Sequence, residues 1–256
     1  RVLFRSWTRQ FGTADDEWEW NLAIAANGSA YVGGYTTGAF PGYNNLGGND
    51  VTVATVSANG STVSVNQFGT AEDDAAGWYG VPIAVAPSGG LLMATATDGT
   101  TWGARSNTGP HDISLSHIPV PGSNKGVTSS QWMAQLGSDA KDEIAVAQSD
   151  NKGNTYVYGI TKGAIEPGRT ADSNNDLFLA KYGPSGDLLW VRQFGTGADD
   201  EPSTQIAVRP NGDVYVSGYT FGDFPGYTNA GTGGDHAGSE DVFLAKFTKN
   251  GALAWV

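Results

Sequence analysis

The chain contains four copies of one short pattern, and this repetition restricts its fold more than any other feature of the sequence. Each copy holds a glutamine followed by an apolar residue and a glycine: residues 7–13 (WTRQFGT), 65–70 (VNQFGT), 132–138 (WMAQLGS) and 190–196 (WVRQFGT). The glutamines stand at positions 10, 67, 135 and 193. A period of this length predicts stacked structural units, none of which can bury its apolar side chains alone.

Every copy reads as four short strands joined by turns. The apolar stretch at 206–208 leads into Asn211-Gly212, and Asn-Gly between apolar runs is the strongest short signal for a hairpin. A strand of the type YVxGYT follows, as at 215–220. The next strand begins with an aspartate in every copy: Asp50, Asp112, Asp176 and Asp241. No stretch has the periodicity of a useful helix, so the chain is predicted to be all-β.

The predicted architecture is a β-propeller of four-stranded antiparallel blades, with about four blades present. We assign residues 7–66 to the first blade, 67–131 to the second, 132–192 to the third and 193–256 to the fourth, all in one propeller domain. The second blade is degenerate, since Ser64 stands where tryptophan is expected. Residues 1–6 fit no copy and are interpreted as a non-native leader. A β-helix is less favoured because its coils are usually shorter.

The composition excludes several classes of partner. The chain has 26 acidic and 14 basic side chains, a formal net charge of −12, and nucleic acid binding needs clustered Lys and Arg. The same charge disfavours an anionic membrane surface. No apolar run reaches the roughly 18 residues that a membrane-spanning helix needs, so membrane insertion is not expected. There is no cysteine, which excludes disulfides and thiolate metal sites.

The repeat resembles a known bacterial family. Its consensus, WxRQFGT followed by IAVxxNGxxYVxGYT and DxFLAKYxxxGxLxW, is similar to the SBBP-type β-propeller repeat, and residues 190–255 match it almost throughout. The resemblance covers about residues 7–256 and implies an exported, secreted or surface-located bacterial protein, in a larger ring of about seven blades. It supplies no catalytic residues. The rest of its own propeller is therefore one expected partner of this chain.

Successive strands of a blade run antiparallel, so the loops alternate between two faces. The short Asn-Gly turns share one face. The long loops share the other: residues 13–20, 70–80 and 196–203, together with 36–49 and 220–240. Long loops on a rigid scaffold are where binding usually occurs, so any ligand surface is expected on this long-loop face.

Acidic residues recur in the long loops at one position of the repeat. The candidate metal ligands are Asp15, Asp16, Asp73, Asp74, Asp199 and Asp200. Clustered carboxylates suit Ca²⁺, which is the one cofactor considered. The favoured alternative is that each aspartate caps a turn by accepting backbone N–H groups, because repetition in every blade indicates a structural role. Repetition also argues against a glycosidase centre built from these carboxylates, since an active site normally occurs once.

Aromatic residues in the loops are the other candidates for a ligand surface, since they can stack on sugars or anchor a protein. They are Trp18, Trp20, Tyr43, Trp78, Tyr79, Trp102 and Tyr227. The loops at 40–43 and 224–227 share the sequence Phe-Pro-Gly-Tyr, and we favour a role for their Phe-Pro pairs in filling the space between blades.

The sequence alone favours a non-catalytic extracellular scaffold that binds a protein or a glycan through the long-loop face. This expectation rests on the repeat and on the absence of a singular catalytic motif. The alternative is a carbohydrate-active enzyme, a lyase or a hydrolase, with its site on the same face.

Overall fold

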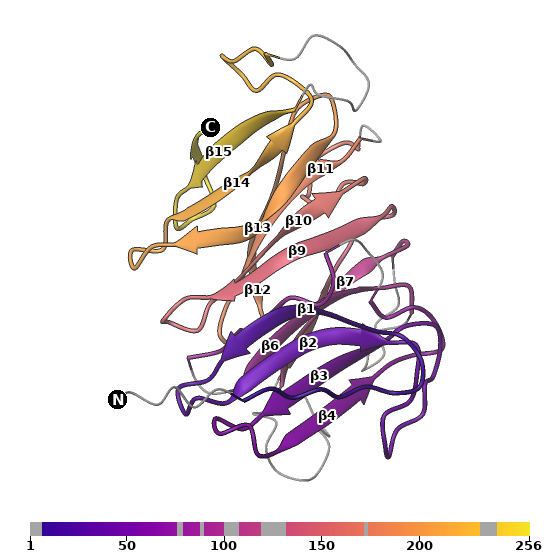
Figure 1. The fold of residues 1–256 in the computed structure, drawn as a ribbon. Helices are drawn as coiled ribbons and strands as arrows, with labels where there is room; N and C mark the ends of the chain where they lie inside the picture. Colours follow the sequence, from indigo (N-terminus) through magenta and orange to yellow (C-terminus); the bar gives the residue numbers. More distant parts are fainter. Residues whose placement is uncertain are drawn as a thin grey trace.

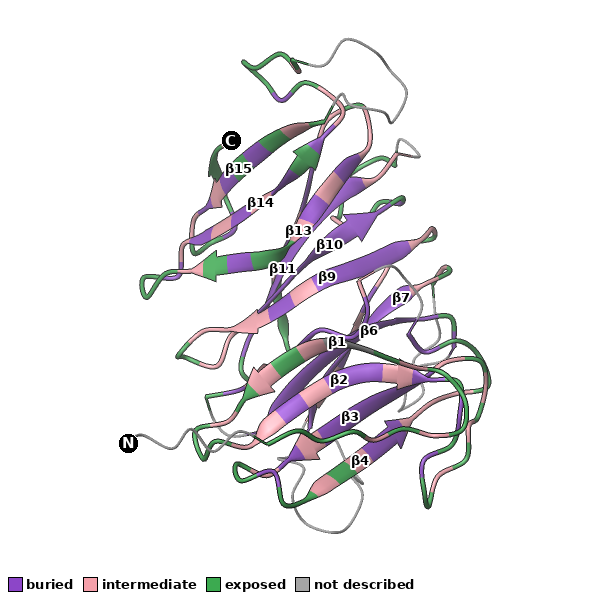
Figure 2. Ribbon diagram, in the orientation of Figure 1, coloured by how far each residue is buried: buried purple, intermediate pink, exposed green. Residues whose placement is uncertain are grey.

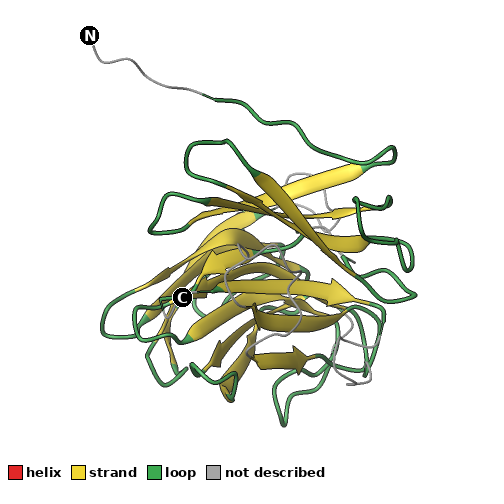
Figure 3. Cartoon of the chain, turned by 90° about the horizontal axis from the view of Figure 1, so that it is seen from below, coloured by secondary structure: helices red, strands yellow, loops and turns green. Residues whose placement is uncertain are grey.

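The protein is described by a computed structural model that covers residues 7–75, 79–87, 90–99, 108–118, 132–171, 174–230 and 240–256. Within these ranges the chain forms strands, turns and loops, and no helix (Figure 3). A search of the same ranges for a helix that could span a membrane finds none. The all-β prediction is confirmed for the described chain.

The strands form four antiparallel sheets, each built from four strands that are consecutive in the sequence. The first sheet holds β1 (Glu17–Ile24), β2 (Ala30–Thr36), β3 (Asp50–Val56) and β4 (Val63–Phe68). The second holds β5 (Ile83–Val85), β6 (Leu91–Thr97), β7 (Asp112–Ile118) and β8 (Trp132–Leu136). The third holds β9 (Asp142–Ser149), β10 (Thr155–Thr161), β11 (Asp176–Tyr182) and β12 (Leu188–Phe194). The fourth holds β13 (Asp200–Val208), β14 (Val214–Thr220), β15 (Asp241–Phe247) and β16 (Leu253–Trp255).

The sheets lie side by side in chain order, from the first at the bottom of Figure 1 to the fourth at the top. Their first strands contact one another: β1 with β5, β5 with β9, and β9 with β13. The predicted four-stranded antiparallel units are therefore confirmed. The boundaries between them differ from those assigned, because each of the first three sheets ends later than expected: β4 includes Gln67, β8 includes Trp132, and β12 includes Gln193. A cyclic repeat pattern does not reveal at which strand each sheet begins.

The apolar core lies between neighbouring sheets. Leu115 of the second sheet and Phe178 of the third belong to one cluster, and Leu179 of the third and Phe243 of the fourth belong to another. Val53 of the first sheet packs in a third cluster with residues of the second. Full burial of one such side chain stabilises the fold by about 1.5–3 kcal/mol. Each sheet therefore buries apolar side chains against its neighbours, and Figure 2 shows where buried residues lie along the strands.

A tryptophan and a glycine join consecutive sheets at their outer strands. The pairs that do so are Trp132 with Gly186 and Trp190 with Gly251, and Trp7, which lies before β1, packs on Gly60 of the first sheet in the same way. Gly186 has φ of 86° in the turn between β11 and β12, which favours glycine, and a Cβ there would lie 2.6 Å from the Trp132 ring. Arg192 adds a hydrogen bond from its Nε to the Gly251 carbonyl at 2.9 Å, and Arg9 donates to the Gly60 carbonyl in the same way. The repeated Trp and Gly thus fix the packing of the second sheet against the third and of the third against the fourth.

In the first and third sheets the repeated glutamine bonds the long loop to the third strand. The Gln193 side chain, 2% exposed, donates from Nε2 to Asp176 Oδ2 at 2.7 Å and to the Gly163 carbonyl at 3.0 Å. Its Oε1 accepts the backbone N–H of Ile165 at 3.0 Å. Gln67 makes the corresponding three bonds in the first sheet, and Gln135 bonds Asp112 in the second. The strand-initial aspartates are therefore structural.

Candidate functional site

A cleft opens on the long-loop face beside the starts of β9 and β13. It has a volume of about 430 Å³. Its lining comes from the loop before β5 and from the third and fourth sheets, and the residues are Tyr79, Lys141, Glu143, Ile160, Lys162, Asn175, Glu201 and Tyr219. These segments lie far apart in the sequence, and the packing of the sheets brings them together.

The acidic loops fold so that two glutamates reach this cleft. The backbone N–H of Ser138 donates to Asp142 Oδ2, and that of Thr196 donates to Asp200 Oδ2, each at 2.6 Å. Asp142 and Asp200 are buried, and this burial raises the pKa of each carboxyl to about 6. Successive side chains of a strand point to opposite faces. Glu143 and Glu201, the next residues, line the cleft.

Two neutral donors orient the Glu201 carboxylate. The Tyr79 hydroxyl donates to Oε2 at 2.6 Å, and the Asn175 side-chain amide donates to Oε1 at 2.7 Å. Desolvation, and next the hydrogen bond to Glu201, raise the pKa of Tyr79 far above its ordinary value. Tyr79 therefore stays protonated and remains a donor at every physiological pH.

Cationic and aromatic groups complete the cleft. Glu143, only 1% exposed, forms an ion pair with Lys141, and His111 Nδ1 lies 4.0 Å from the same carboxylate oxygen. Burial, and next the charge of Glu201, raise the pKa of Tyr219. A pocket with two carboxylates, amine and amide donors and two phenol rings can hydrogen-bond sugar hydroxyls and exchange protons with them.

The carboxylates singled out from the sequence as metal ligands lie outside this lining. Asp73 Oδ1 accepts the backbone N–H of Asn49, and Asp199 Oδ1 accepts that of Asn175, each at 2.8 Å. Asp74 is buried and accepts the backbone N–H and hydroxyl of Thr70, as Asp200 does from Thr196. Asp15 and Asp16 are exposed. Asp74 and Asp200 thus cap turns of their own loops, whereas Asp73 and Asp199 bond a neighbouring loop 24 residues away in the sequence. Over the described ranges no group of three or more His, Cys, Asp or Glu side chains could hold a metal ion, and calcium binding stays a prediction.

The aromatic candidates have different surroundings. Tyr79 lines the cleft, whereas Trp18, 50% exposed, stacks on Tyr35 with ring centroids 6.5 Å apart. The Tyr43 hydroxyl donates to Asn66 at 3.2 Å, and Tyr227 is exposed beside a different groove. Phe40 and Phe224, the first residues of the Phe-Pro-Gly-Tyr loops, are both buried. Trp78 and Trp102 lie outside the described residues, as does the side chain of Trp20.

Sequence reasoning missed Glu143 and Glu201 as site residues, although one signal pointed to them. Both follow the buried aspartate of the repeat directly, and the first two copies carry Trp18 and Ala75 at that position. A carboxylate that breaks the repeat is a better site candidate than one that belongs to it. The sequence could not show that both breaks face one cleft with Tyr79.

Comparison with known proteins gives limited matches. No protein-family model matches the chain, so its resemblance to SBBP-type repeats stays a prediction. Over 81 residues it is 32% identical to the regulatory protein FlaEY of Caulobacter vibrioides, a match that covers 32% of this chain and 8% of that protein. The chain therefore spans a small part of that relative.

Solved structures of two sugar-cleaving enzymes share features of the fold. A GH93 α-L-arabinofuranosidase of Fusarium graminearum, in complex with arabinobiose, has a TM-score of 0.47 at 10% identity, over 92% of this chain and 65% of that one. A mutant β-fructofuranosidase of Microbacterium saccharophilum K-1 has a TM-score of 0.37 at 14% identity, over 92% of this chain and 57% of that one.

These neighbours correct the functional expectation drawn from the sequence. The solved structures that resemble it are glycoside hydrolases, whereas the sequence led us to expect a non-catalytic binding scaffold, and that expectation is withdrawn. At such low identity the likeness concerns the fold alone, and the named activities are those of the two neighbours.

Proposed function

We propose that this chain is a carbohydrate-active enzyme that hydrolyses glycosidic bonds in the cleft, with Glu143 and Glu201 as its two working carboxylates. The observation that carries the proposal is their position: they come from adjacent sheets, they line one cleft, and only the third and fourth copies carry a glutamate there. Glycoside hydrolysis ordinarily uses a pair of carboxyl groups on either side of the scissile bond.

The surroundings of the two glutamates suggest their roles. One carboxyl group must give a proton to the leaving oxygen, while the other activates water or attacks the sugar. Glu201 suits the second role because Tyr79 and Asn175 fix its orientation without neutralising its charge. Glu143 is the other carboxyl group that lines the cleft, and since its ion pair with Lys141 keeps it ionised at rest, it would supply the proton only after taking one up. Lys141 and His111 lie beside it and can take part in replacing that proton.

The test measures turnover on a panel of polysaccharides and aryl glycosides. Release of reducing ends reports cleavage of the polysaccharides, and release of the aryl alcohol reports cleavage of the glycosides. Glu201→Gln and Glu143→Gln are expected to lower kcat/KM at least about 100-fold, the usual contribution of a positioned acid or base. Glu72→Gln is the matched control, since this exposed glutamate lies in an acidic loop and not in the cleft lining. Thermal unfolding of each variant checks that the fold is retained.

Three outcomes would overturn the proposal: no turnover by the unaltered chain, sugar binding without turnover, or full activity of Glu201→Gln. A product with an unsaturated sugar ring, detected by its ultraviolet absorbance, would instead identify a lyase.

We also propose that the four sheets form part of a larger ring of about seven blades in an exported protein. Apolar residues exposed at both ends of the row support this: Leu22 and Ile24 in the first sheet are 66% and 59% exposed, and Val242 in the fourth is 86% exposed. In a polypeptide that carries further repeats, we expect those repeats and these four sheets to unfold in a single calorimetric transition. Separate transitions would contradict the ring.

A further inference from the structure

Two lysines line the cleft, and both depart from the repeat. Lys141 lies directly before the buried Asp142, and the other three copies have an aspartate at this position: Asp16, Asp73 and Asp199. Lys162 follows Thr161, the last residue of β10, and the other copies have Thr37, Asp98 and Phe221 there. A chain with a net charge of −12 thus brings two basic residues to one cleft, at positions where no other copy has one.

The backbone shows that these positions are equivalent in the four copies. The Lys162 N–H donates to the Lys141 carbonyl at 2.9 Å, and the same bond joins residues 37 and 16, 98 and 73, and 221 and 199 at 2.9–3.1 Å. The side chains behave differently. Asp73 and Asp199 each accept a backbone N–H from the long loop of the preceding sheet, whereas Lys141 forms an ion pair with Glu143. The third copy therefore keeps the backbone of the repeat and reverses the charge at position 141.

The two lysines differ in the partners that they have. Lys141 neutralises Glu143, and Glu201 is held by the neutral donors Tyr79 and Asn175. Lys162 is exposed, and none of the ion pairs among the residues that the structure describes includes it. The carboxylates of the cleft thus have their partners without Lys162, and its positive charge is available to a ligand.

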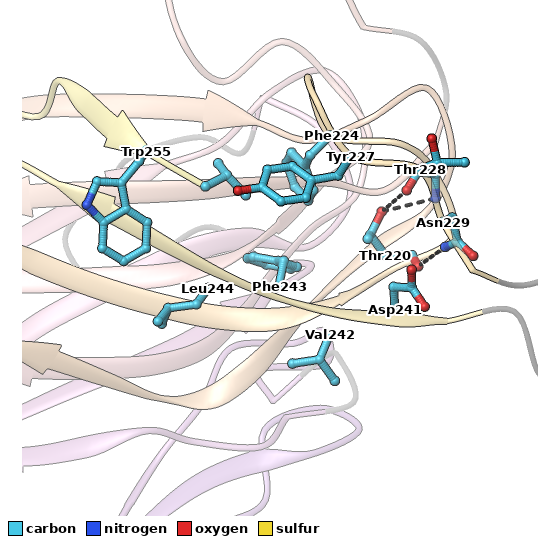
Figure 4. A pocket seen from close by; sticks show the side chains of 12 residues that line it. Thr220, Phe224, Tyr227, Thr228, Asn229, Asp241, Val242, Phe243, Leu244 and Trp255 are labelled. Atoms are coloured by element: carbon cyan, nitrogen blue, oxygen red, sulfur yellow. Dashed lines mark hydrogen bonds between the residues drawn. The ribbon is translucent and has the colours of Figure 1, made fainter.

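A second groove near the long loops shows that the fold does not require these lysines. It has a volume of about 350 Å³ and runs beside Tyr227 in the fourth sheet (Figure 4). Its lining includes Phe224, Val242 and Trp255, and its one charged residue is Asp241. A groove bordered by a long loop therefore forms without a basic residue, so the lysines of the cleft need an explanation of their own.

We propose that the cleft takes an acidic sugar, one that carries a carboxylate or a sulfate ester, and that Lys162 binds this anionic group. The inference rests on the proposed function, because it takes the cleft as the place where a glycan binds. Hydrogen bonds from a lysine to an anionic oxygen are about twice as strong as those between neutral groups. A neutral sugar would gain no such bond.

The positions of the charged groups suit a sugar that spans the cleft. Lys162 follows β10 of the third sheet, and Glu201 belongs to β13 of the fourth. A bound sugar can therefore present its anionic group to the lysine and its glycosidic bond to the glutamate. Lys141 contributes by neutralising Glu143, since two uncompensated carboxylates would repel an anionic ligand.

The experiment measures binding of the full chain to a panel of oligosaccharides by isothermal titration calorimetry. The panel holds matched neutral, uronate and 6-sulfated members of the gluco, galacto and manno series. At least one acidic member is expected to bind about tenfold more tightly than its neutral counterpart. The uronate and sulfated members distinguish the two sources of negative charge. The preference should shrink as salt is added, because an exposed ion pair is screened.

Three variants locate the preference. Lys162→Met keeps most of the side-chain length without its charge and should weaken binding of the preferred acidic member about tenfold. Lys162→Arg keeps the charge and should bind within about threefold of the unaltered chain. Lys152→Met is the matched control, since it removes the same charge from an exposed lysine in the turn between β9 and β10, outside the cleft lining.

A preference for an acidic member that Lys162→Met abolishes and Lys162→Arg retains supports the inference. Equal binding of acidic and neutral members, equal losses in Lys162→Met and Lys152→Met, or a panel in which no member binds overturns it. Its failure is distinct from failure of the proposed function. Cleavage of neutral glycosides without any preference for acidic ones overturns this inference alone, whereas an acidic member that binds through Lys162 and is not cleaved overturns only the proposed hydrolysis.

Discussion

The strands β11 and β15 have nearly the same sequence and opposite surroundings. All seven residues of β11 are buried, whereas β15 alternates between buried and exposed positions. In Figure 2 the third sheet's β10 is buried throughout, while β14 and β15 carry exposed segments. The face of β15 toward the third sheet remains covered, since Phe243, Ala245 and Phe247 are buried.

This difference teaches that one face of each repeat is stabilised by the previous sheet and the other by the next. The sequence of a strand encodes both faces at once, so it cannot show which face has a neighbour. Burial in a repeat protein is a nearest-neighbour property. The stability of each sheet should therefore respond differently to changes on its two faces, and substitutions can test this.

The largest expected difference is between Leu177→Ala and Val242→Ala. Removing the fully buried Leu177 side chain should lower the free energy of unfolding by about 2–5 kcal/mol, the range for leucine in a packed core. Val242→Ala at the matching exposed position should change it by less than about 0.5 kcal/mol. Urea unfolding followed by tryptophan fluorescence measures both. Equal losses would contradict the exposure of Val242 on this face of β15.

A smaller difference is expected between the glutamines. Gln193→Ala should cost about 2 kcal/mol, because it leaves Asp176 and two buried backbone groups of the long loop without their donor or acceptor. Gln10→Ala should leave the monomer's unfolding free energy unchanged, since Gln10 is exposed. Comparable losses in the two variants would contradict the structural role that we assign to the buried glutamine.

The same contrast explains what the sequence could predict. The Asn-Gly turns, the strand-initial aspartates and the repeated Trp and Gln are local signals, and they were sufficient for the strand content and the antiparallel units. Turn capping by Asp74 and Asp200 was foreseeable because it is a local interaction, whereas the bonds of Asp73 and Asp199 to a neighbouring loop were not. The start of each sheet was not predictable, because the same order of strands repeats along the chain. The sequence around Trp132 is therefore the same whether this strand ends one sheet or begins the next.

The candidate site depends on information that is not local. Tyr79, Glu143 and Glu201 come from three segments, and only the packing of the sheets brings them to one cleft. Tyr79 was a candidate among seven aromatic residues with nothing to rank it first. The useful signal was an exception to the repeat, the glutamates that stand where other copies have Trp18 and Ala75.

The smallest expected effect is on the pH dependence of the free energy of unfolding, to which the third and fourth sheets should contribute equally. Burial raises the pKa of both Asp142 and Asp200 from 3.8 to about 6. A raised pKa stabilises the fold while the carboxyl is protonated, so this stability is present below pH 3.8 and is lost as the pH rises through 6. The free energy of unfolding should thus be lower at pH 7 than at pH 5, by about 1 kcal/mol for the pair after allowance for solvent screening. Asp142→Asn and Asp200→Asn should each remove about half of this pH dependence, and urea unfolding at the two pH values measures it. Unequal effects of the two variants would show that the pKa of Asp200 in β13 also responds to the exposed edge of the fourth sheet.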